Sequence, residues 1–402
     1  MSDKIFRIQS IVKKDNRVEA AIQHEGKTST IFFECDDPAL IPSPEALLAV
    51  TLMPAMRAGA ELQMGTEISK RILEAVPTLQ DIHHTWYPDF FQHIPVTEAT
   101  PVERHNPEAQ RVGLFFSLGV DSWYTFLKHR DTITDLIFVW GVDIFFNQTS
   151  LFEEAKRNLQ IVANAFQKNL VIVKTNMTEF TDPYTPYHHI FGSALSGIGH
   201  LLSGGLKTVY ISAHLTYKNL IEAGSHALVD PLWSSETLQV IHEGEDAPRL
   251  EKVRLLAQDE VAMQTLRVCW RNIGEVYNCG TCEKCLRTMV ALQAVGALER
   301  CATFNTKIDI KQLRKQHYLD DSTVCFHKEN LDALKLQPEN QALFKAERSV
   351  IAFHHYKTFL ARIRSLYPGF RFGFGKLLRR FRKKKPYWTD YLSMKNTPDR
   401  FQ

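Results

Sequence analysis

The chain has 402 residues and a formal net charge of +3, so its charge balance alone names no partner. Hydrophobic residues make up 44% of it and charged residues 23%, as in ordinary globular proteins with room for two or three domains. No run approaches the ~18 apolar residues of a membrane helix. The opening MSDKIFRIQSIVKKD lacks the apolar core of a secretion signal, so we expect a cytoplasmic protein.

Residues 1–108 predict a separate α+β domain at the start of the chain. Its expected elements are strands over 5–12, 17–23 and 28–34, a hairpin turn at 25–27, and helices over 44–57 and 66–76. The polar, proline-bearing stretch 97–110 then predicts a linker to the next domain.

Strands alternate with helices from residue 111 onward. Continuous apolar runs predict strands over 111–119, 135–144, 169–176 and 207–215, separated by helices that begin near 121, 151 and 186. This alternation predicts a doubly wound parallel α/β sheet in a domain spanning 109–305. Ligands of such sheets bind beyond the carboxyl ends of the strands, near the point where the strand order reverses.

The remaining residues, 306–402, predict a helical C-terminal region. Helices are expected over 307–317, 328–337 and 340–366. The tail then holds seven basic groups and no acid within 376–385. It is either a contact for nucleic acid or an anionic membrane, or a solvated basic end.

The first of two chemically distinctive motifs follows the strand at 111. It reads Ser117-Leu118-Gly119-Val120-Asp121-Ser122 and runs into a helix. Hydroxyl donors, a turn glycine and a helix N-terminus together favour an anion site. An acid in such a loop repels phosphates unless a divalent cation lies between them, so the hexapeptide favours Mg²⁺–ATP. In the plainer alternative, Asp121 is a helix N-cap and Gly119 a turn glycine.

This hexapeptide resembles the SGGxDS loop of the N-type ATP pyrophosphatases, the PP-loop family. The resemblance implies an adenine nucleotide α-hydrolase-like fold and a loop, 117–122, that holds the β- and γ-phosphates, with Asp121 and Ser122 in catalytic roles. A substrate oxygen is then adenylated and pyrophosphate leaves. Leu118 stands where the family has the first glycine of the pair. Leucine is strained there if the position needs positive φ, and crowds the phosphates if a bare backbone is needed.

The second motif is a cluster of cysteines. Cys279, Cys282 and Cys285 form two overlapping CxxC units, and Cys269 lies ten positions upstream. Four thiolates at this spacing predict a tetrahedral Zn²⁺ knuckle. Free buried cysteines, a redox CxxC pair and an iron–sulfur cluster are the alternatives.

The pattern C-x9-CGxC-x2-C after a PP-loop domain resembles the zinc site of the 7-cyano-7-deazaguanine synthase family. That family converts a carboxylate to a nitrile with ATP and ammonia. The resemblance covers residues 111–290 and leaves out both ends of the chain.

Further candidates lie at the expected strand ends. Asp143 and Lys174 end the second and third strands and His214 ends the fourth. Because ligands bind at such strand ends, Asp143 and Lys174 are candidates for nucleotide contact and His214 for substrate contact. Alternatively, they are helix caps or solvated strand ends.

Two segments are candidates for substrate contacts. In 224–236 the family resemblance favours Asp230 and Ser234. His188 and His189 stand where the synthase family carries an Arg-Asn pair. They are general bases or nucleobase contacts, or they are inert residues of an amphipathic helix.

The resulting function hypothesis is ATP-dependent adenylation of a carboxylate or amide oxygen, followed by attack of an amine or ammonia, as in an AMP-forming C–N ligase. The acceptor is a small molecule or a macromolecule; the family's antiphage-defence relatives make a protein, peptide or sugar acceptor and a partner protein the main alternative. In a third hypothesis, Leu118 marks a degenerate loop in a non-catalytic nucleotide-binding subunit.

Overall fold

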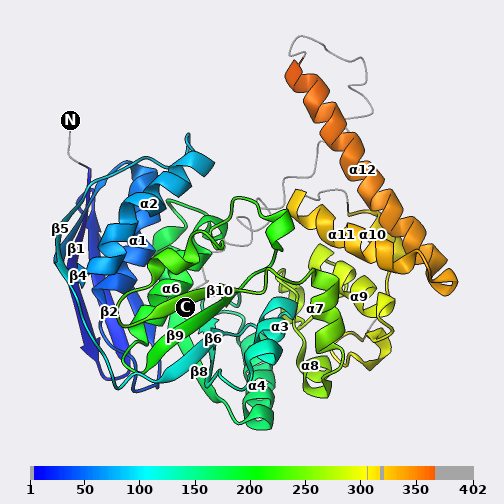
Figure 1. Cartoon of the computed structure of the whole chain (residues 1–402), viewed down its shortest axis with the longest axis horizontal. Helices are drawn as coiled ribbons and strands as arrows, with labels where there is room; N and C mark the ends of the chain where they lie inside the picture. The colour runs from blue at the N-terminus through cyan, green and yellow to red at the C-terminus, as the bar shows by residue number, and fades with distance from the viewer. Residues whose placement is uncertain (1–3, 306, 317–320, 367–402) are drawn as a thin grey trace. The chain divides into compact units, whose positions relative to one another are not determined.

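The computed structural model describes residues 4–305, 307–316 and 321–366 (Figure 1). The basic tail at 376–385 lies outside the described residues. The strands are β1 (Ile5–Lys14), β2 (Arg17–His24), β3 (Lys27–Glu34), β4 (Glu61–Ser69), β5 (Val96–Val102), β6 (Arg111–Phe115), β7 (Asp135–Trp140), β8 (Asn169–Thr175), β9 (Leu206–Ser212) and β10 (Gln239–Glu243). The α-helices are α1 (Pro44–Ala58), α2 (Lys70–Trp86), α3 (Val120–His129), α4 (Thr149–Phe166), α5 (Met177–Thr181), α6 (Phe191–Leu201), α7 (Arg249–Leu256), α8 (Glu260–Thr265), α9 (Glu283–Ala294), α10 (Ile310–Arg314), α11 (Asp321–Leu334) and α12 (Gln341–Leu366). Among the described residues, no helix combines the length and apolarity that crossing a membrane requires.

All ten strands belong to one sheet, in the order β10-β9-β6-β7-β8-β3-β2-β1-β4-β5. The pairs β8–β3, β3–β2 and β2–β1 are antiparallel, and the other neighbours are parallel. The predicted α/β class with a mostly parallel sheet is therefore confirmed.

The parallel half of the sheet is doubly wound around β6. From β6 the chain moves outward through β7 to β8, and then returns to the other side of β6 for β9 and β10. The strand order therefore reverses between β6 and β9. Loops that leave the carboxyl ends of these two strands border the crevice where open α/β sheets bind ligands.

The N-terminal strands do not form a sheet of their own. The β3 strand pairs with β8 through Phe33–Thr175 and Glu34–Lys174, so the segment before residue 109 extends the α/β sheet. The predicted hairpin turn is present, with Glu25 at φ 50° and Gly26 at φ 75°, as the tight two-residue turn requires.

Two predicted elements in this segment are wrong. The helix expected over 66–76 begins only at Lys70, because β4 continues to Ser69, whose side chain accepts a hydrogen bond from the Ile72 N–H as the N-cap. The linker expected over 97–110 contains β5, which pairs in parallel with β4. Its Pro101 is tolerated because β5 lies at the edge of the sheet.

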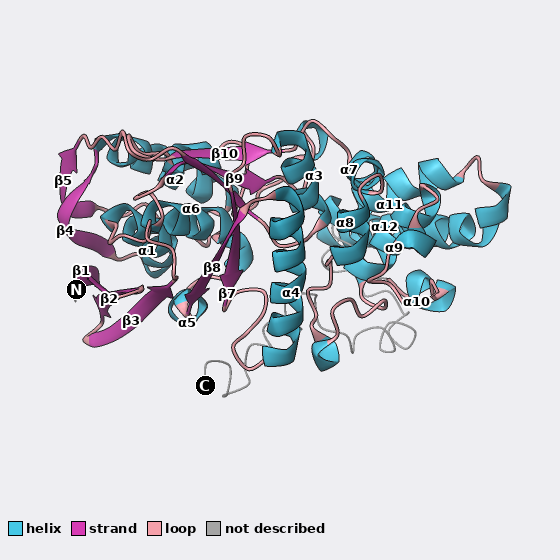
Figure 2. Cartoon of the chain, turned by 90° about the horizontal axis from the view of Figure 1, so that it is seen from below, coloured by secondary structure: helices cyan, strands magenta, loops and turns pink. Residues whose placement is uncertain are grey.

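Helices cover both faces of the sheet, and Figure 2 shows α1 and α6 on one side of the strands with α3 and α4 on the other. Every residue of α1 from Glu45 to Met56 is buried. Gly197 of α6 permits close packing, since a Cβ there would lie 3.0 Å from the Ala46 carbonyl oxygen of α1. The opposite face carries an aromatic cluster of Phe116, Trp123, Phe126 and Phe166.

The chain divides into two compact units. The first comprises residues 1–146 and 152–247, and the second comprises 147–151 and 248–402. The second unit contains α7 to α12, so the predicted helical C-terminal part is confirmed. The boundaries expected from the sequence at 108/109 and 305/306 stay a prediction about independently folding segments.

Candidate functional site

The loop after β6 changes direction at Leu118 and enters α3 at Val120. The β6 strand ends at Phe115, and the Phe116 N–H still donates to the Ile137 carbonyl of β7 at 2.8 Å. Gly119 is the N-cap of α3 in an extended conformation, with φ −78° and ψ 165°, and no side chain caps the helix there. An α-helix without a side-chain cap presents backbone N–H groups and the positive end of its dipole to whatever lies beyond it.

Leu118 carries the strain of this turn. Its φ of 64° lies in the left-handed region, and its side chain is fully buried. A left-handed L-residue other than glycine costs roughly 1–2 kcal/mol. In this chain position 118 therefore adopts the positive φ that glycine tolerates best, although it carries a buried leucine.

The polar residues of the loop differ in how they are engaged. Ser117 and Asp121 are half-buried, whereas Ser122 is buried and its Oγ donates to the Gly119 carbonyl at 3.1 Å. Ser122 therefore stabilises the turn. Thr125 makes a similar contact with the preceding turn, since its Oγ1 donates to the Asp121 carbonyl at 3.2 Å. Hydroxyls, an uncapped helix start and one carboxylate form a donor set that fits a phosphate with a bridging Mg²⁺.

The candidates at the other strand ends lie on the same edge of the sheet as the loop. Asp143 follows β7 and is exposed, and His214 follows β9 with its ring 6.3 Å from that of Phe191. Lys174 lies in β8, where its Nζ is 5.1 Å from the ring centroids of both Trp140 and Phe146. That cation–π contact holds the ammonium over the two rings.

Ser212 is a residue of this edge that the sequence did not single out. It ends β9, two positions beyond the Tyr210 that pairs with Leu114 of β6. Within the described residues, its Oγ is buried without a hydrogen-bond partner. A buried hydroxyl without a partner loses hydrogen-bond energy that a bound polar ligand can restore.

The candidates for substrate contacts fall into different environments. Ser234 is buried, with Oγ accepting from the Val240 N–H at 3.0 Å, so it ties the preceding turn to β10. His188 is exposed, whereas His189 packs against the ring of Tyr87 at 4.5 Å. Burial lowers the pKa of His189 to about 3, with smaller contributions from the neighbouring His188 and His83. The ring of His189 is therefore neutral.

Asp230 is the candidate that the structure places in a polar network. Its carboxylate Oδ2 lies 2.6 Å from the Oγ of Ser225 and 2.7 Å from Nδ1 of His242. The sequence did not single out Ser225 or His242, because their pairing with Asp230 depends on how β10 packs beside the preceding turn. A histidine inside the short strand QVIHE offers no motif that would have revealed it.

The four cysteines of the second motif come together in the second unit. The sulfur atoms of Cys269, Cys279, Cys282 and Cys285 all lie within 4.8 Å of one another, and they are the one such ligand group found in the described part of the chain. The Cys282 N–H donates to the Cys279 sulfur at 3.3 Å, and the Cys285 N–H donates to the Cys282 sulfur at 3.4 Å. Gly280, at φ 63°, makes the tight turn between the first two.

This cluster has the chemistry of a metal centre. Hydrogen bonds from the thiols of Cys269, Cys282 and Cys285 lower the pKa of the Cys279 thiol well below its usual range. The contacts with Cys269 and Cys279 raise the pKa values of the Cys282 and Cys285 thiols. Against the hydrogen bond to Cys279, Cys282 and Cys285 lower the pKa of the Cys269 thiol to about 6. The thiolates of Cys279 and Cys269 are therefore favoured, whereas four thiolates together require a cation that balances their charge. Four sulfurs with backbone N–H donors can hold a metal ion such as zinc.

A buried charge network adjoins the cluster on α9. Glu283, next to Cys282, lies 3.3 Å from Nε of Arg287 and 3.4 Å from Nε2 of His327 on α11. His327 Nδ1 lies 2.6 Å from Glu347 on α12. Against the effect of burial, Glu347 and then Glu283 raise the pKa of His327 to about 9, so the imidazolium ties three helices together.

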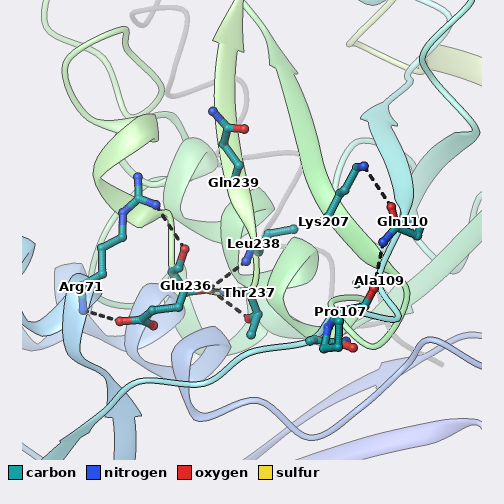
Figure 3. Close-up of a pocket in the computed structure, with 11 residues that line it drawn as sticks. Arg71, Pro107, Ala109, Gln110, Lys207, Glu236, Thr237, Leu238 and Gln239 are labelled. Atoms are coloured by element: carbon teal, nitrogen blue, oxygen red, sulfur yellow. Dashed lines mark hydrogen bonds between the residues drawn. The ribbon is translucent and has the colours of Figure 1, made fainter.

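One cavity of the first unit has no predicted site residue in its lining. It has a volume of about 330 Å³ and lies where β9 and β10 begin, at the edge opposite the loop. Figure 3 shows Lys207 directed at Gln110 and Arg71 at the turn containing Glu236. These side chains are engaged with the protein itself, since the Arg71 guanidinium donates to the Ser235 carbonyl at 3.3 Å. The cavity therefore does not carry the functional assignment.

Comparisons with known proteins returned no family model, no curated protein and no solved structure with significant similarity to the chain. Any functional assignment therefore rests on the two motifs and on the geometry around them.

Proposed function

We propose that the chain is an ATP-dependent enzyme of the PP-loop type, which adenylates an oxygen of an acceptor and releases pyrophosphate. One observation carries the proposal: the loop 117–122 leaves β6 at the point where strand order reverses and enters α3 without a side-chain cap. This is the position at which open α/β sheets bind nucleotides, and the uncapped amides suit phosphate oxygens.

Each loop residue would make a different contact with the bound Mg²⁺–ATP. Amides at the start of α3 and the Ser117 hydroxyl would donate to the β- and γ-phosphates, while Ser122 maintains the turn through Gly119. Mg²⁺, when bound, would neutralise charge between Asp121 and the phosphates. Held in this way, the α-phosphorus faces an acceptor oxygen, and effective molarity lowers the barrier to attack.

The second half of the proposed reaction forms a carbon–nitrogen bond. Adenylation turns an acceptor oxygen into a good leaving group, so an amine or ammonia can attack the activated carbon and expel AMP. The acceptor is a small molecule or a macromolecule bearing a carboxylate or amide. We assign the four cysteines to a structural Zn²⁺, because four protein ligands leave no open coordination position for chemistry.

The test measures pyrophosphate release from Mg²⁺–ATP with a panel of carboxylic acids and ammonium chloride. Asp121→Asn is expected to lower the rate at least 100-fold, because it removes the charge that balances the metal. Asp131→Asn is the matched control, since Asp131 is almost fully exposed after α3. Equal rates for wild type and Asp121→Asn would refute the assignment of Asp121.

Leu118 supports one competing assignment, a non-catalytic subunit, because its buried leucine replaces a bare backbone. Calorimetric titration with Mg²⁺–ATP separates the two. Micromolar binding with pyrophosphate release supports the enzyme. Binding without pyrophosphate release, or absence of both, in protein that retains its metal, supports the degenerate loop.

A further inference from the structure

A second polar network of the first unit lies at the same edge of the sheet as the nucleotide loop. His242 is the penultimate residue of β10, and its Nδ1 lies 2.7 Å from Asp230. The Ser225 hydroxyl completes the group, at 2.6 Å from the same carboxylate oxygen and 3.3 Å from Nδ1. All three side chains are buried, so these contacts define the orientation of the imidazole.

Asp230 is held rigidly enough to orient a histidine. It is fully buried in the short helical turn Asp230–Trp233, and its Oδ1 accepts from the His226 N–H at 3.4 Å. Gly192, in the first turn of α6, leaves it space: a Cβ there would lie 2.2 Å from Oδ1. A carboxylate that accepts from Nδ1–H fixes the tautomer in which Nε2 carries the lone pair.

The Nε2 side of His242 faces a second acid at a longer distance. Glu245 Oε1 lies 3.8 Å from Nε2, beyond direct hydrogen-bond length, so Nε2 keeps its lone pair without a direct bond to this acid. Glu245 is fixed by its backbone, since its carbonyl accepts from the Tyr217 N–H at 3.1 Å.

The end of β10 is tied to the helix that begins in the nucleotide loop. Lys128 of α3 lies 2.7 Å from Glu243 and 2.9 Å from Asp246, and Thr125 donates to the Glu243 carbonyl at 3.5 Å. The orienting acid, the histidine and the second acid therefore belong to the edge that the proposed function assigns to ATP.

We propose that His242, oriented by Asp230, is the proton acceptor for the nitrogen nucleophile of the second half-reaction. The inference rests on the proposed function. The amine nitrogen forms a bond to the activated carbon of the adenylated acceptor and transfers one proton to Nε2 of His242. The carbon–oxygen bond to AMP then breaks, AMP leaves with the electron pair, and Nε2 gives up the proton when the products leave. The co-substrate is accordingly ammonia or a small amine.

The first arm of the test observes the ring itself. Full-length protein labelled with ¹⁵N-histidine, assigned by comparison with His242→Gln, is observed by NMR at pH 8. We expect a protonated Nδ1 and an unprotonated Nε2 that shifts on addition of hydroxylamine, a small amine probe. A ring protonated on both nitrogens and insensitive to hydroxylamine would identify a structural ion pair and overturn the proposal.

The second arm separates the two half-reactions. His242→Gln and Asp230→Asn should still release pyrophosphate, while formation of the amide or nitrile product falls at least 100-fold. His105→Gln, at an exposed histidine before β6, is the matched control and should retain both. Equal loss of pyrophosphate and product would show a structural role and overturn the inference. If wild type released no pyrophosphate with any acid, the proposed function would fail, and the NMR arm would still decide the state of His242.

Discussion

The helices α3 and α9 begin in opposite ways, although both follow a short motif that stands out in the sequence. Gly119 at the start of α3 offers no side chain to the first N–H groups. Cys282 at the start of α9 accepts from the Cys285 N–H through its sulfur. An uncapped helix start attracts anions, whereas a helix start filled with sulfur acceptors is prepared for a cation. The ligand class at each motif follows from what the N-cap residue presents.

The acids in the two first turns extend this contrast. Asp121 in α3 is half-buried, whereas Glu283 in α9 is enclosed by Arg287 and His327. Burial opposes ionisation of Glu283, but Arg287 and His327 hold its pKa below the usual value. The acid of α9 is thus a structural charge within a buried network, whereas the acid of α3 is partly exposed at the start of its helix.

Loss of the metal site at the start of α9 should have the largest effect on stability. Cys285 is fully buried, and Cys285→Ala should abolish metal binding and unfold the second unit, because structural zinc contributes on the order of 10 kcal/mol to folding. Elemental analysis and thermal melting check this outcome. Cys325→Ala, which lies outside the cluster, is the control and should keep about one metal ion per chain. Full metal content in Cys285→Ala would contradict the assignment.

The charge network around α9 should make stability depend on pH. The folded-state pKa of His327, about 9, exceeds its ordinary value of 6.5. Its contribution is therefore fully present below about pH 6.5 and is lost as pH rises through 9. The difference corresponds to ~3 kcal/mol. Urea unfolding at pH 6.5 and 9.5 measures it, and His327→Gln should flatten the dependence. An equal slope in that variant would exclude His327 as the cause.

Leu118 permits a test of the strained turn before α3. Both Leu118→Ala and Leu118→Gly lose a buried side chain, which costs roughly 2–5 kcal/mol. Glycine removes the strain of the positive φ, so Leu118→Gly should be about 1 kcal/mol more stable than Leu118→Ala. Denaturant unfolding measures both. At the buried Leu114 of β6 the order should reverse, with alanine more stable than glycine.

A new cap on α3 should have the smallest effect on stability and a specific effect on binding. Gly119 already has the extended conformation of an N-cap, so Gly119→Asn should stabilise the free protein by a few tenths of a kcal/mol. Its side chain would occupy the N–H groups assigned to phosphate, and affinity for Mg²⁺–ATP should fall. Gly119→Ala provides the matched substitution without a cap. Unchanged affinity in Gly119→Asn would argue against phosphate at these amides.

Features that depend only on residues close together in the sequence could be predicted. The apolar runs of β6, β7, β8 and β9 gave the parallel strands, and the cysteine spacing gave the ligand group of the second unit. The turn between β2 and β3 was evident from the glycine in 25–27, since Gly26 adopts positive φ without strain.

Features that depend on tertiary pairing could not be predicted. Residues 66–69 continue β4 because they pair with β5, and nothing local distinguishes them from the start of α2. The pairing of Asp230 with His242 joins a turn to a strand 12 residues later. Asp230 was a candidate through the family resemblance, but no local motif marks His242, so the pairing of the two is visible only in the fold.

The pairing of β3 with β8 has a consequence for synthesis on the ribosome. When β3 has just been made, its partner β8 lies about 140 residues further along the chain. The helix α6, which covers α1, begins about 160 residues after β3. During that interval the edge of β3 and the apolar face of α1 are exposed without their native partners. Nascent chains are most prone to aggregate in this state. Fusing residues 1–108 to a reporter without the rest should give insoluble product, and the nascent chain should depend on chaperones until β8 emerges.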